Sequence, residues 1–197
     1  MLSTSQKILK RSFDLMLSAL LLPVFILPII LLVLLASWDT RQWGVFSQQR
    51  VGQYGSLFPI YKIRSLRGGN HVLGHLEQYA SPFGRWLRRH KLDEWPQLFN
   101  VLFGHMSFVG PRPDVEGFAD LLEGEDRVVL EVKPGITGPA TLKYANEDVL
   151  LSQQIDPEAY NVSVIWPDKV KINKKYVHNW HFFVDLTYIF QSFQINL

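Results

Sequence analysis

The stretch LMLSALLLPVFILPIILLVLLASW, residues 15–38, decides the fold of this protein. It lies between Asp14 and Asp39, contains no Asp, Glu, Lys or Arg, and consists mostly of Leu, Ile and Val. A helix that crosses a bilayer needs about 20 apolar residues, so the stretch is long enough to enter or cross a membrane. It is too long for the apolar core of a signal peptide and ends without a small-residue cleavage pattern.

Pro23 and Pro28 interrupt this stretch. Each proline removes a backbone donor and crowds the carbonyl four residues earlier, which kinks or breaks a helix. Residues 15–22 and 24–36 would form helices of about 12 Å and about 20 Å, each shorter than the roughly 30 Å core of a bilayer. Basic residues flank both ends and are compatible with both ends staying cytoplasmic. The residues alone leave open a re-entrant helix–break–helix hairpin, a kinked single span, and the core helix of a soluble protein.

Outside this stretch the composition is that of an ordinary globular domain. The chain has 197 residues, 47% of them hydrophobic, with 20 basic and 18 acidic residues and a formal net charge of +2. These values exclude a disordered chain, a collagen, a coiled coil and a transporter with many spans. The absence of cysteine excludes disulfides and cysteine nucleophiles, and the near-neutral charge gives no case for nucleic acid. We expect a membrane element in residues 1–40 and one compact domain in residues 41–197.

Local patterns in residues 41–197 predict a mostly helical α/β domain with a small β-hairpin. Gly52 and Gly55 separate two alternating segments, which is typical of a hairpin with a slightly long loop. Ser81 followed by Pro82 is typical of a helix start with Ser as the N-cap. The predicted elements are strands at 45–52 and 57–66, a polar mobile loop at 67–78, and helices from 82, at 92–104, at 146–154 and from 167 to the C-terminus.

The adjacent acids Asp93 and Glu94 are the first candidates for chemistry. Neighbouring carboxylates on a helix cannot flank a glycosidic bond, which needs carboxyl groups at least about 5 Å apart on opposite sides. They can share a divalent cation with phosphate oxygens, one as ligand and one as nucleophile. The alternative is an acid pair that complements the dipole at a helix N-terminus.

Basic residues close to this pair are candidates for phosphate binding. Arg112 stands between Pro111 and Pro113, whose fixed φ angles hold its backbone stiffly, and a guanidinium binds phosphate with two hydrogen bonds. A plain turn is the alternative there. A further group just before Asp93 either clamps a diphosphate, contacts anionic lipid, or forms a solvated helix face; it comprises Arg85, Arg88, Arg89 and Lys91.

The C-terminal region is rich in aromatic residues. They form either part of the core or a belt at the membrane interface, where amphipathic helices place such side chains. These residues are Trp180, Phe182, Phe183, Tyr188 and Phe190. We therefore expect membrane-interface helices in the compact domain.

Six motifs are spread over most of the chain. The two most specific are LRRHKLDEWPQLFNV at 87–101 and MSFVGPRP at 106–113, and the others are KRSFD at 10–14, RVG at 50–52, YKIRS at 61–65 and KPGITG at 133–138. Their sequences and their order resemble those of the bacterial sugar transferases, the monotopic polyprenyl-phosphate phosphoglycosyl transferases.

The resemblance implies a reaction. A UDP-sugar donates its sugar-1-phosphate to polyprenyl (undecaprenyl) phosphate and UMP is released. Asp93 attacks the β-phosphate and forms a phosphosugar-aspartyl intermediate, which the lipid phosphate then attacks. Glu94 assists, with Mg²⁺ bridging the carboxylates and the diphosphate. This would be the first membrane step in assembling a lipid-linked glycan such as O-antigen, capsule, exopolysaccharide or a glycoprotein glycan.

The resemblance also implies a site and a location. The residues expected to bind substrate phosphate are Arg88, Arg112, Lys62, Arg64, Pro111 and Pro113. A re-entrant membrane helix, broken at Pro23, would keep the catalytic domain on the cytoplasmic face of a bacterial inner membrane. The bilayer is then a partner, and a homodimer is compatible with this arrangement. A transferase that works through a direct ternary complex, with Asp93 as metal ligand only, and a membrane-anchored scaffold without activity are the alternatives.

Three positions depart from the pattern of the family. Lys91 stands where many members have Ser or Thr, and Leu22 replaces the Ser that precedes the proline of the membrane helix. Residues 139–144, PATLKY, stand where many members have Trp-Ala-Gln after the Gly-Ile-Thr-Gly turn. This last difference bears on the sugar or the uridine of the donor.

Overall fold

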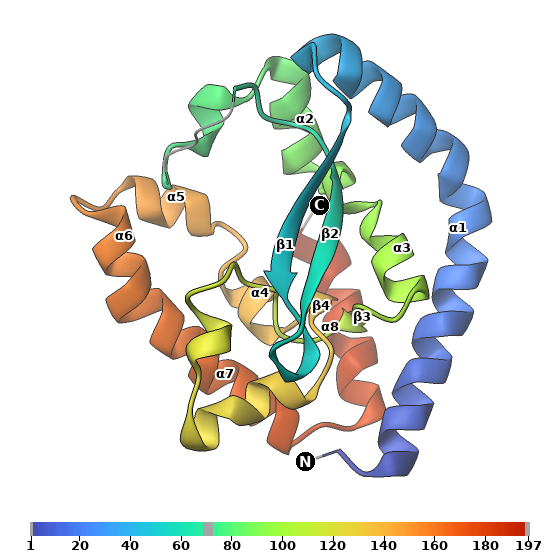
Figure 1. Cartoon of the computed structure of the whole chain (residues 1–197), viewed down its shortest axis with the longest axis vertical. Helices are drawn as coiled ribbons and strands as arrows, with labels where there is room; N and C mark the ends of the chain where they lie inside the picture. The colour runs from blue at the N-terminus through green and yellow to red at the C-terminus, as the bar shows by residue number, and fades with distance from the viewer. Residues whose placement is uncertain (1, 69–72, 196–197) are drawn as a thin grey trace.

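The structure, a computed structural model, describes residues 2–68 and 73–195, and within them it is mostly helical (Figure 1). The predicted mobile loop lies partly outside the described residues, at 69–72. The helices are α1 (Thr4–Thr40), α2 (Pro82–Arg89), α3 (Gln97–Leu102), α4 (Pro139–Lys143), α5 (Glu147–Ser152), α6 (Pro157–Tyr160), α7 (Trp166–His178) and α8 (Phe182–Ile195). The strands are β1 (Val45–Val51), β2 (Leu57–Ile63), β3 (Ser107–Val109) and β4 (Gly135–Thr137).

The long apolar stretch forms the greater part of α1. The helix begins with a capping box, in which the Ser3 side chain accepts from the Gln6 N–H and the Gln6 side chain accepts from the Ser3 N–H. It then continues through both Pro23 and Pro28 and curves along one side of the molecule (Figure 1). The structure thus differs from the expected helix–break–helix, because each proline removes one hydrogen bond and bends the helix without ending it.

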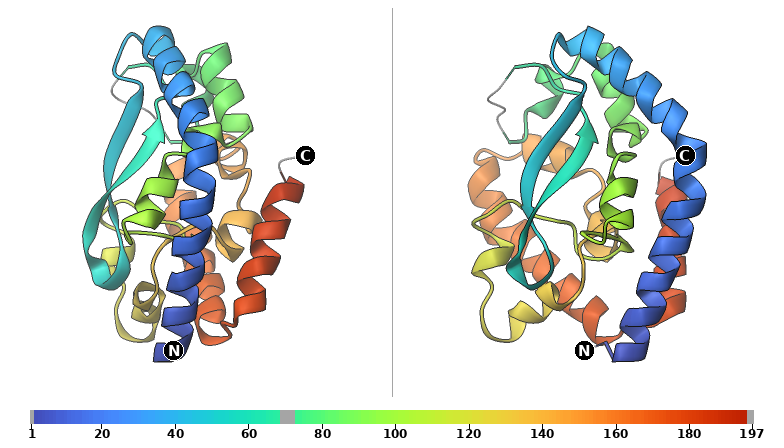
Figure 2. Two further views of the ribbon diagram at one scale, coloured as in Figure 1. Left: turned by 90° about the vertical axis from the view of Figure 1, so that its right-hand side faces the viewer. Right: turned by 45° about the vertical axis from the view of Figure 1, so that its right-hand side comes forward.

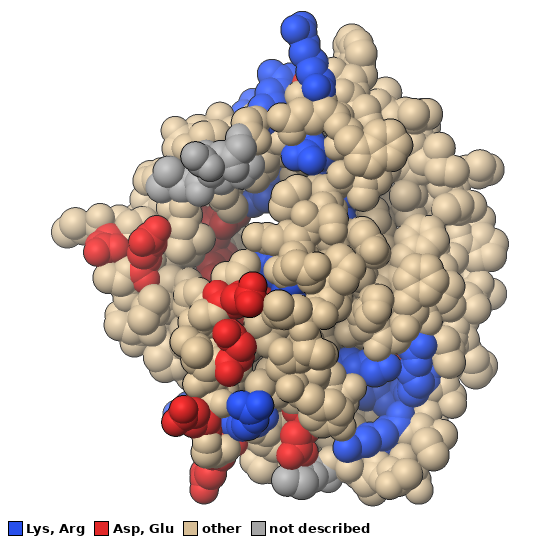
Figure 3. Space-filling view, in the orientation of Figure 1, with Lys and Arg blue, Asp and Glu red and all other residues tan. Residues whose placement is uncertain are grey.

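One side of α1 packs on the domain and the other is exposed. The inner side buries Ile29, Leu32, Val33 and Ala36. The outer side exposes a continuous set of large apolar side chains, namely Ile8, Leu9, Leu15, Met16, Leu20, Val24, Leu27, Ile30, Leu31, Leu34, Leu35 and Trp38. The surface over the middle of α1 is uncharged (Figure 3). The helix is long and apolar enough to cross a membrane, and an exposed apolar face of this size is typical of contact with lipid or another protein.

The predicted β-hairpin is confirmed. β1 pairs antiparallel with β2, from Val45 opposite Ile63 to Val51 opposite Leu57. A short 3-10 turn, Gln53–Gly55, joins the strands, and both Tyr54 and Gly55 adopt positive φ there. The hairpin crosses the front of the molecule in Figure 1, and Lys62 near the end of β2 reaches the site described below.

A second, parallel pair of strands joins two segments in which no strand is predicted from the sequence. Ser107 pairs with Gly135 and Val109 with Thr137. The backbones approach so closely that a Cβ on Gly135 would lie 2.1 Å from the Gly110 nitrogen, so glycine is required. This pair holds the Pro111–Pro113 segment in place at the end of β3.

The helices after the hairpin follow the sequence in part. Ser81 caps α2 by accepting from the Gly84 N–H at 2.9 Å, as predicted. The predicted helix at 92–104 is instead a 3-10 turn at Leu92–Glu94 followed by α3. The predicted C-terminal helix is likewise divided into α7 and α8, and α8 lies beside the first half of α1 (Figure 2).

The C-terminal aromatic residues divide between core and surface. Trp180 is buried, whereas Phe183 and Phe190 are exposed on α8. Of the two predicted alternatives, Trp180 therefore fits the core, and Phe183 and Phe190 fit the exposed belt.

A buried polar cluster joins α1 to α7 and α8. We call it the anchor cluster, and it comprises Lys10, Asp14, Tyr176, Trp180 and Asp185. Asp185 accepts from Lys10 Nζ, from the Tyr176 hydroxyl at 2.7 Å and from Trp180 Nε1 at 3.1 Å. The first turns of α1 are thereby fixed to the C-terminal helices.

Asp14 extends the same cluster to β3. Its Oδ1 accepts from the Ser107 hydroxyl and from the Phe108 N–H, both at 3.0 Å. The membrane-type helix and the strand that leads to Arg112 are therefore joined by direct hydrogen bonds.

Candidate active site

A cleft of about 2010 Å³ lies between the hairpin, α2, the segment after β3, and α5 and α7. Acidic and basic side chains meet at this hollow, between α5 and the hairpin (Figure 3). Asp93 and Glu94 lie in its wall, together with Lys62, Arg88 and Arg112. The cleft therefore gathers most of the predicted site residues, which come from four separate parts of the chain.

The backbone turns sharply just before the acid pair. Lys91 has φ 54° and ψ 22°, a left-handed conformation that is strained for a residue other than glycine. The 3-10 turn Leu92–Glu94 follows at once and directs both carboxylates inward, with Asp93 5% and Glu94 9% exposed. Neither acid caps a helix, so the geometry does not support a pair that merely complements a helix dipole.

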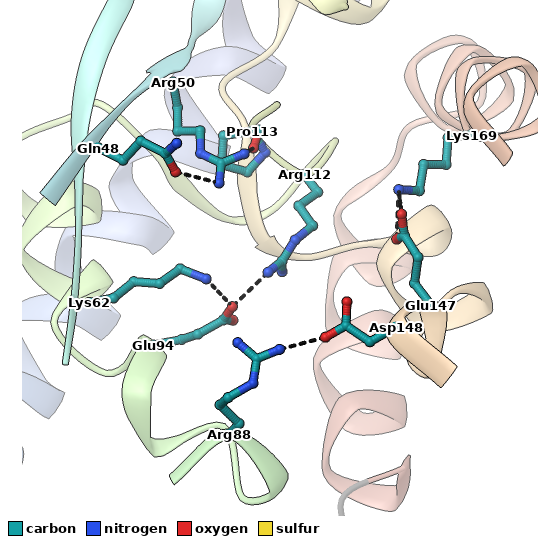
Figure 4. Close-up of polar contacts among 10 residues, drawn as sticks. All are labelled: Gln48, Arg50, Lys62, Arg88, Glu94, Arg112, Pro113, Glu147, Asp148 and Lys169. Atoms are coloured by element: carbon teal, nitrogen blue, oxygen red, sulfur yellow. Dashed lines mark hydrogen bonds and ion pairs between the residues drawn. The ribbon is translucent and has the colours of Figure 1, made fainter. Parts of the chain in front are cut away.

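One carboxylate oxygen of Glu94 is paired with two cations in the cleft. Its Oε1 accepts from Lys62 Nζ at 2.8 Å and from Arg112 Nη2 at 2.7 Å (Figure 4). Burial alone would raise the pKa of Glu94, but Arg112 and Lys62 outweigh it and hold the pKa well below its usual value of 4.5. The same contact raises the pKa of Arg112, while burial lowers that of Lys62. Glu94 is therefore ionised at neutral pH and orients both cations.

Asp93, in contrast to Glu94, lacks hydrogen-bond partners for one of its oxygens among the described residues. Its Oδ1 is buried and has no hydrogen-bond partner within residues 2–68 and 73–195. Burial raises the pKa of Asp93 above its usual value of 3.8, and the positive charges of Lys62, Arg88 and Lys91 oppose that shift. An unpaired carboxylate oxygen in a cleft is costly to bury, and such groups with a perturbed pKa are concentrated at functional sites.

Arg88 and Arg112 approach the acids from different elements. Arg88 is in the last turn of α2 and forms an ion pair with Asp148 of α5, while Arg112 contacts Glu94 (Figure 4). Both guanidinium groups lie close to the carboxylates, as a pair of phosphate-binding groups would.

Three other predicted phosphate-binding residues have different positions. Arg64 lines the cleft, but its Nε donates to the Trp43 carbonyl at 2.8 Å and its guanidinium lies over the Phe46 ring. Pro111 is buried behind the cleft, where its carbonyl accepts from the Gly135 N–H at 2.8 Å. Pro113 lines the cleft, and its carbonyl accepts from Arg50 at 3.4 Å. The prolines thus shape the segment that carries Arg112.

Sequence reasoning missed several charged and polar residues in the same cleft. Arg50 appeared only within the RVG motif, and Asp114, directly after Pro113, was not considered. Burial raises the pKa of Asp114 to about 6. Lys169 and Asn173 are one helical turn apart on α7, a spacing that indicates a shared face but not what the face contacts.

The acid pair is the place where a metal ion would bind. No group of three or more metal-ligating side chains occurs in the part of the chain that the structure describes. Mg²⁺, however, is commonly held by one or two carboxylates together with substrate phosphates and water. The unpaired Oδ1 of Asp93 beside Glu94 fits that pattern.

An exposed apolar helix beside a cleft in which basic side chains surround two buried carboxylates is typical of a membrane-associated enzyme that handles anionic substrates. The chain matches the model of the bacterial sugar transferase family over residues 5–197 and belongs to that family. The predicted family, and with it the prediction of a transferase, is confirmed.

Three relatives illustrate the family. The chain is 34% identical to the uncharacterized sugar transferase EpsL of Bacillus subtilis, over 91% of this chain and 82% of the relative. It is 31% identical to the undecaprenyl-phosphate galactose phosphotransferase of Salmonella typhimurium, over 98% of this chain and 41% of the relative. It is 34% identical to the undecaprenyl-phosphate glucose phosphotransferase of Komagataeibacter xylinus, over 92% of this chain and 34% of the relative. The chain spans less than half the length of these two phosphotransferases.

Proposed function

We propose that this protein transfers sugar-1-phosphate from a UDP-sugar to polyprenyl (undecaprenyl) phosphate and releases UMP. The observation that carries the proposal is the buried, unpaired Oδ1 of Asp93 beside Lys62, Arg88 and Arg112. Relatives over nearly the whole chain are named as undecaprenyl-phosphate galactose and glucose phosphotransferases. The product would begin the assembly of a lipid-linked glycan.

The proposed transfer proceeds in two steps on Asp93. A carboxylate oxygen of Asp93 attacks the β-phosphorus of the donor, the bond from that phosphorus to the bridging oxygen breaks, and UMP leaves with the electron pair. An oxygen of the lipid phosphate then attacks the same phosphorus and displaces the Asp93 carboxylate. Dividing the transfer suits two substrates of unlike solubility, because UMP leaves before the lipid reacts.

The neighbouring charges oppose the repulsion between two anions. Lys62 and Arg112, held by Glu94, place positive charge next to Asp93, where negative charge develops on the phosphoryl oxygens. Arg88 adds a second guanidinium once phosphate replaces Asp148 as its partner. Asp93 and Glu94 would hold Mg²⁺, which when bound neutralises charge on the diphosphate.

The exposed side of α1 supports a place in the membrane. We propose that it inserts in the inner membrane as a re-entrant helix, so that both of its ends and the cleft stay on the cytoplasmic face. The curvature of α1, which contains Pro23 and Pro28, and the basic residues near both of its ends support this topology. Because the chain has no cysteine, single cysteines at positions 3 and 42 would report the side of each end. Labelling from opposite sides would contradict the hairpin.

The reaction is tested with purified protein, a panel of UDP-sugars and undecaprenyl phosphate. We expect UMP release with at least one donor and, without lipid, an acid-stable mass increase of one phosphosugar. Ping-pong kinetics are expected, whereas sequential kinetics without the mass increase would support a ternary complex in which Asp93 only holds metal. The absence of UMP release with every donor would contradict the proposed function.

A further inference from the structure

Some buried polar side-chain atoms in the cleft lack a hydrogen-bond partner, and they include atoms that the proposed reaction does not use. Among the described residues there are four such atoms: Asp93 Oδ1, Arg50 Nε, Thr141 Oγ1 and Asn173 Oδ1. All four residues line the same cleft. Because native proteins leave few buried polar atoms unpaired, their concentration in one cleft points to a ligand that completes them.

Three of these residues come from elements other than the turn that carries Asp93: Arg50 from β1, Thr141 from α4 and Asn173 from α7. Asn173 is 6% exposed on α7, and Lys169, one turn earlier, forms an ion pair with Glu147 at 2.7 Å. Figure 4 shows this pair on the opposite side of Arg112 from Lys62. The positive charges of Lys169 and Arg50 both act on Asp114. These residues mark a second part of the cleft, which we call the distal pocket and define by Arg50, Asp114, Thr141, Lys169 and Asn173.

One wall of the distal pocket is formed by α4. Thr141 lies in this helix and lines the cleft. The Tyr144 hydroxyl donates to Asp168 of α7 at 2.7 Å, and Lys169 lies 5.7 Å from the centre of the Tyr144 ring. The end of α4 is thus held against the helix that carries Asn173.

The chemistry of the distal pocket suits hydroxyl groups. It offers an amide, a hydroxyl, a guanidinium nitrogen and the carboxyl group of Asp114, and so presents donors and acceptors together. A second phosphate would meet Asp114 and Glu147, whereas a sugar hydroxyl can donate to one group and accept from the next. Burial raises the pKa of Asp114 to about 6, so at neutral pH its carboxylate is mainly ionised and accepts hydrogen bonds from hydroxyl groups.

The number of hydroxyl groups distinguishes the two ends of the donor. The sugar carries more free hydroxyl groups than the ribose, and the uracil carries none, so the sugar is the end that best matches the groups of the distal pocket. We propose that the distal pocket binds the sugar of the donor and that Thr141 and Asn173 select it through its hydroxyl groups. This inference rests on the proposed function, since it takes a nucleotide sugar as the ligand.

The test measures binding directly, in an Asp93→Asn background that prevents turnover. UDP-glucose, UDP-galactose, UDP-N-acetylglucosamine and UDP are each titrated by calorimetry. We expect Asn173→Ala and Thr141→Val to weaken the best-bound UDP-sugar about 5- to 30-fold, the usual effect of a lost buried hydrogen bond, and to leave UDP within about twofold. Thr141→Ser, which keeps the hydroxyl, should retain most of the affinity. Asn179→Ala, at the exposed end of α7, is the matched control.

Each other outcome has a defined meaning. If the variants lose equal affinity for UDP and for UDP-sugars, the pocket binds the nucleotide. If they lose affinity for neither, the pocket is not part of the donor site. Either result would overturn the inference. If Asn173→Ala does not fold, the Thr141→Val and Thr141→Ser pair decides. A wild-type protein that binds UDP-sugars without releasing UMP would contradict the proposed function and leave the sugar pocket standing.

Discussion

The anchor cluster and the cleft around Asp93 both bury lysine and carboxylate side chains, yet they differ in how these groups are paired. In the anchor cluster Asp185 accepts from Lys10, Tyr176 and Trp180, and Asp14 accepts from β3. In the cleft Glu94 is paired in the same manner, but Asp93 beside it has an oxygen without a partner among the described residues.

This difference separates a structural role from a reactive one. A buried charge whose hydrogen bonds are complete is costly to break, because removal of one partner leaves the other uncompensated. A buried carboxylate with an unpaired oxygen already destabilises the folded protein, because that oxygen has lost its hydrogen bonds to water without replacing them. The comparison therefore predicts opposite effects on stability and activity when each region is changed.

The largest expected effect is on activity. Asp93→Asn should lower transfer by at least about 10³-fold, as expected for loss of a nucleophile. Folded Asp93 has a raised pKa, so the stability it contributes is complete below its usual pKa of 3.8 and is lost as the pH rises through the folded value. At neutral pH the variant should consequently unfold at the same or a higher temperature. UMP release and thermal unfolding measure both effects, and a variant with wild-type activity would contradict the assigned role.

The next effect is on stability. Asp185→Asn should lower the free energy of unfolding by about 3 kcal/mol, because it breaks the buried ion pair with Lys10 by removing one partner. Transfer per folded molecule should stay within a few-fold of wild type. Denaturant unfolding in detergent measures the change, with the exposed Glu158→Gln as a control expected within about 0.5 kcal/mol. Unchanged unfolding of Asp185→Asn would show that the anchor cluster does not stabilise the fold.

A smaller effect concerns pH. Asp93 must be ionised to attack, so the rate should rise with pH through an apparent pKa above 3.8. Lys91 lowers the pKa of Asp93, and Lys91→Asn removes that charge while tolerating the left-handed backbone. The acid limb of the rate profile should therefore move to higher pH. If the acid limb of the rate profile does not move in this variant, the limb does not reflect the ionisation of Asp93.

Glu94 provides the contrasting case for stability. Its pKa is lowered in the fold, so its contribution is complete above the usual value of 4.5 and is lost as the pH falls through the folded value. Glu94→Gln should accordingly destabilise the protein at neutral pH, unlike Asp93→Asn. The same sign of change in both variants would contradict the comparison.

The smallest expected effect is at the rim of the cleft. The side chains of Arg88 and Asp148 are 24% and 37% exposed, and ion pairs of this exposure contribute at most about 1 kcal/mol. Asp148→Asn frees Arg88 for phosphate, so the affinity for the UDP-sugar should rise about two- to fivefold. Calorimetry measures the change, and a weaker affinity would show that Asp148 itself contacts the donor.

The sequence predicts most of what depends on neighbouring residues. The hairpin follows from alternation around Gly52 and Gly55, and α2 begins at the predicted Ser81 because a cap involves only the next few residues. The motifs around Asp93 and Arg112 are short and local, and their residues line one cleft. The boundaries failed where strain intervenes, as at Lys91, whose left-handed backbone separates α2 from the acid pair.

By itself, the sequence determined the apolar helix, the hairpin, the family and the acid pair, since each is written in residues close together along the chain. Only the tertiary structure decided that Glu94 is paired while Asp93 is not, because Lys62 reaches the site from β2 and Arg112 from the segment after β3. It also decided that Thr141 and Asn173 line the same cleft as Asp93, each with an unpaired polar atom. Those relations depend on distances between elements, which the spacing of residues in a single sequence does not contain.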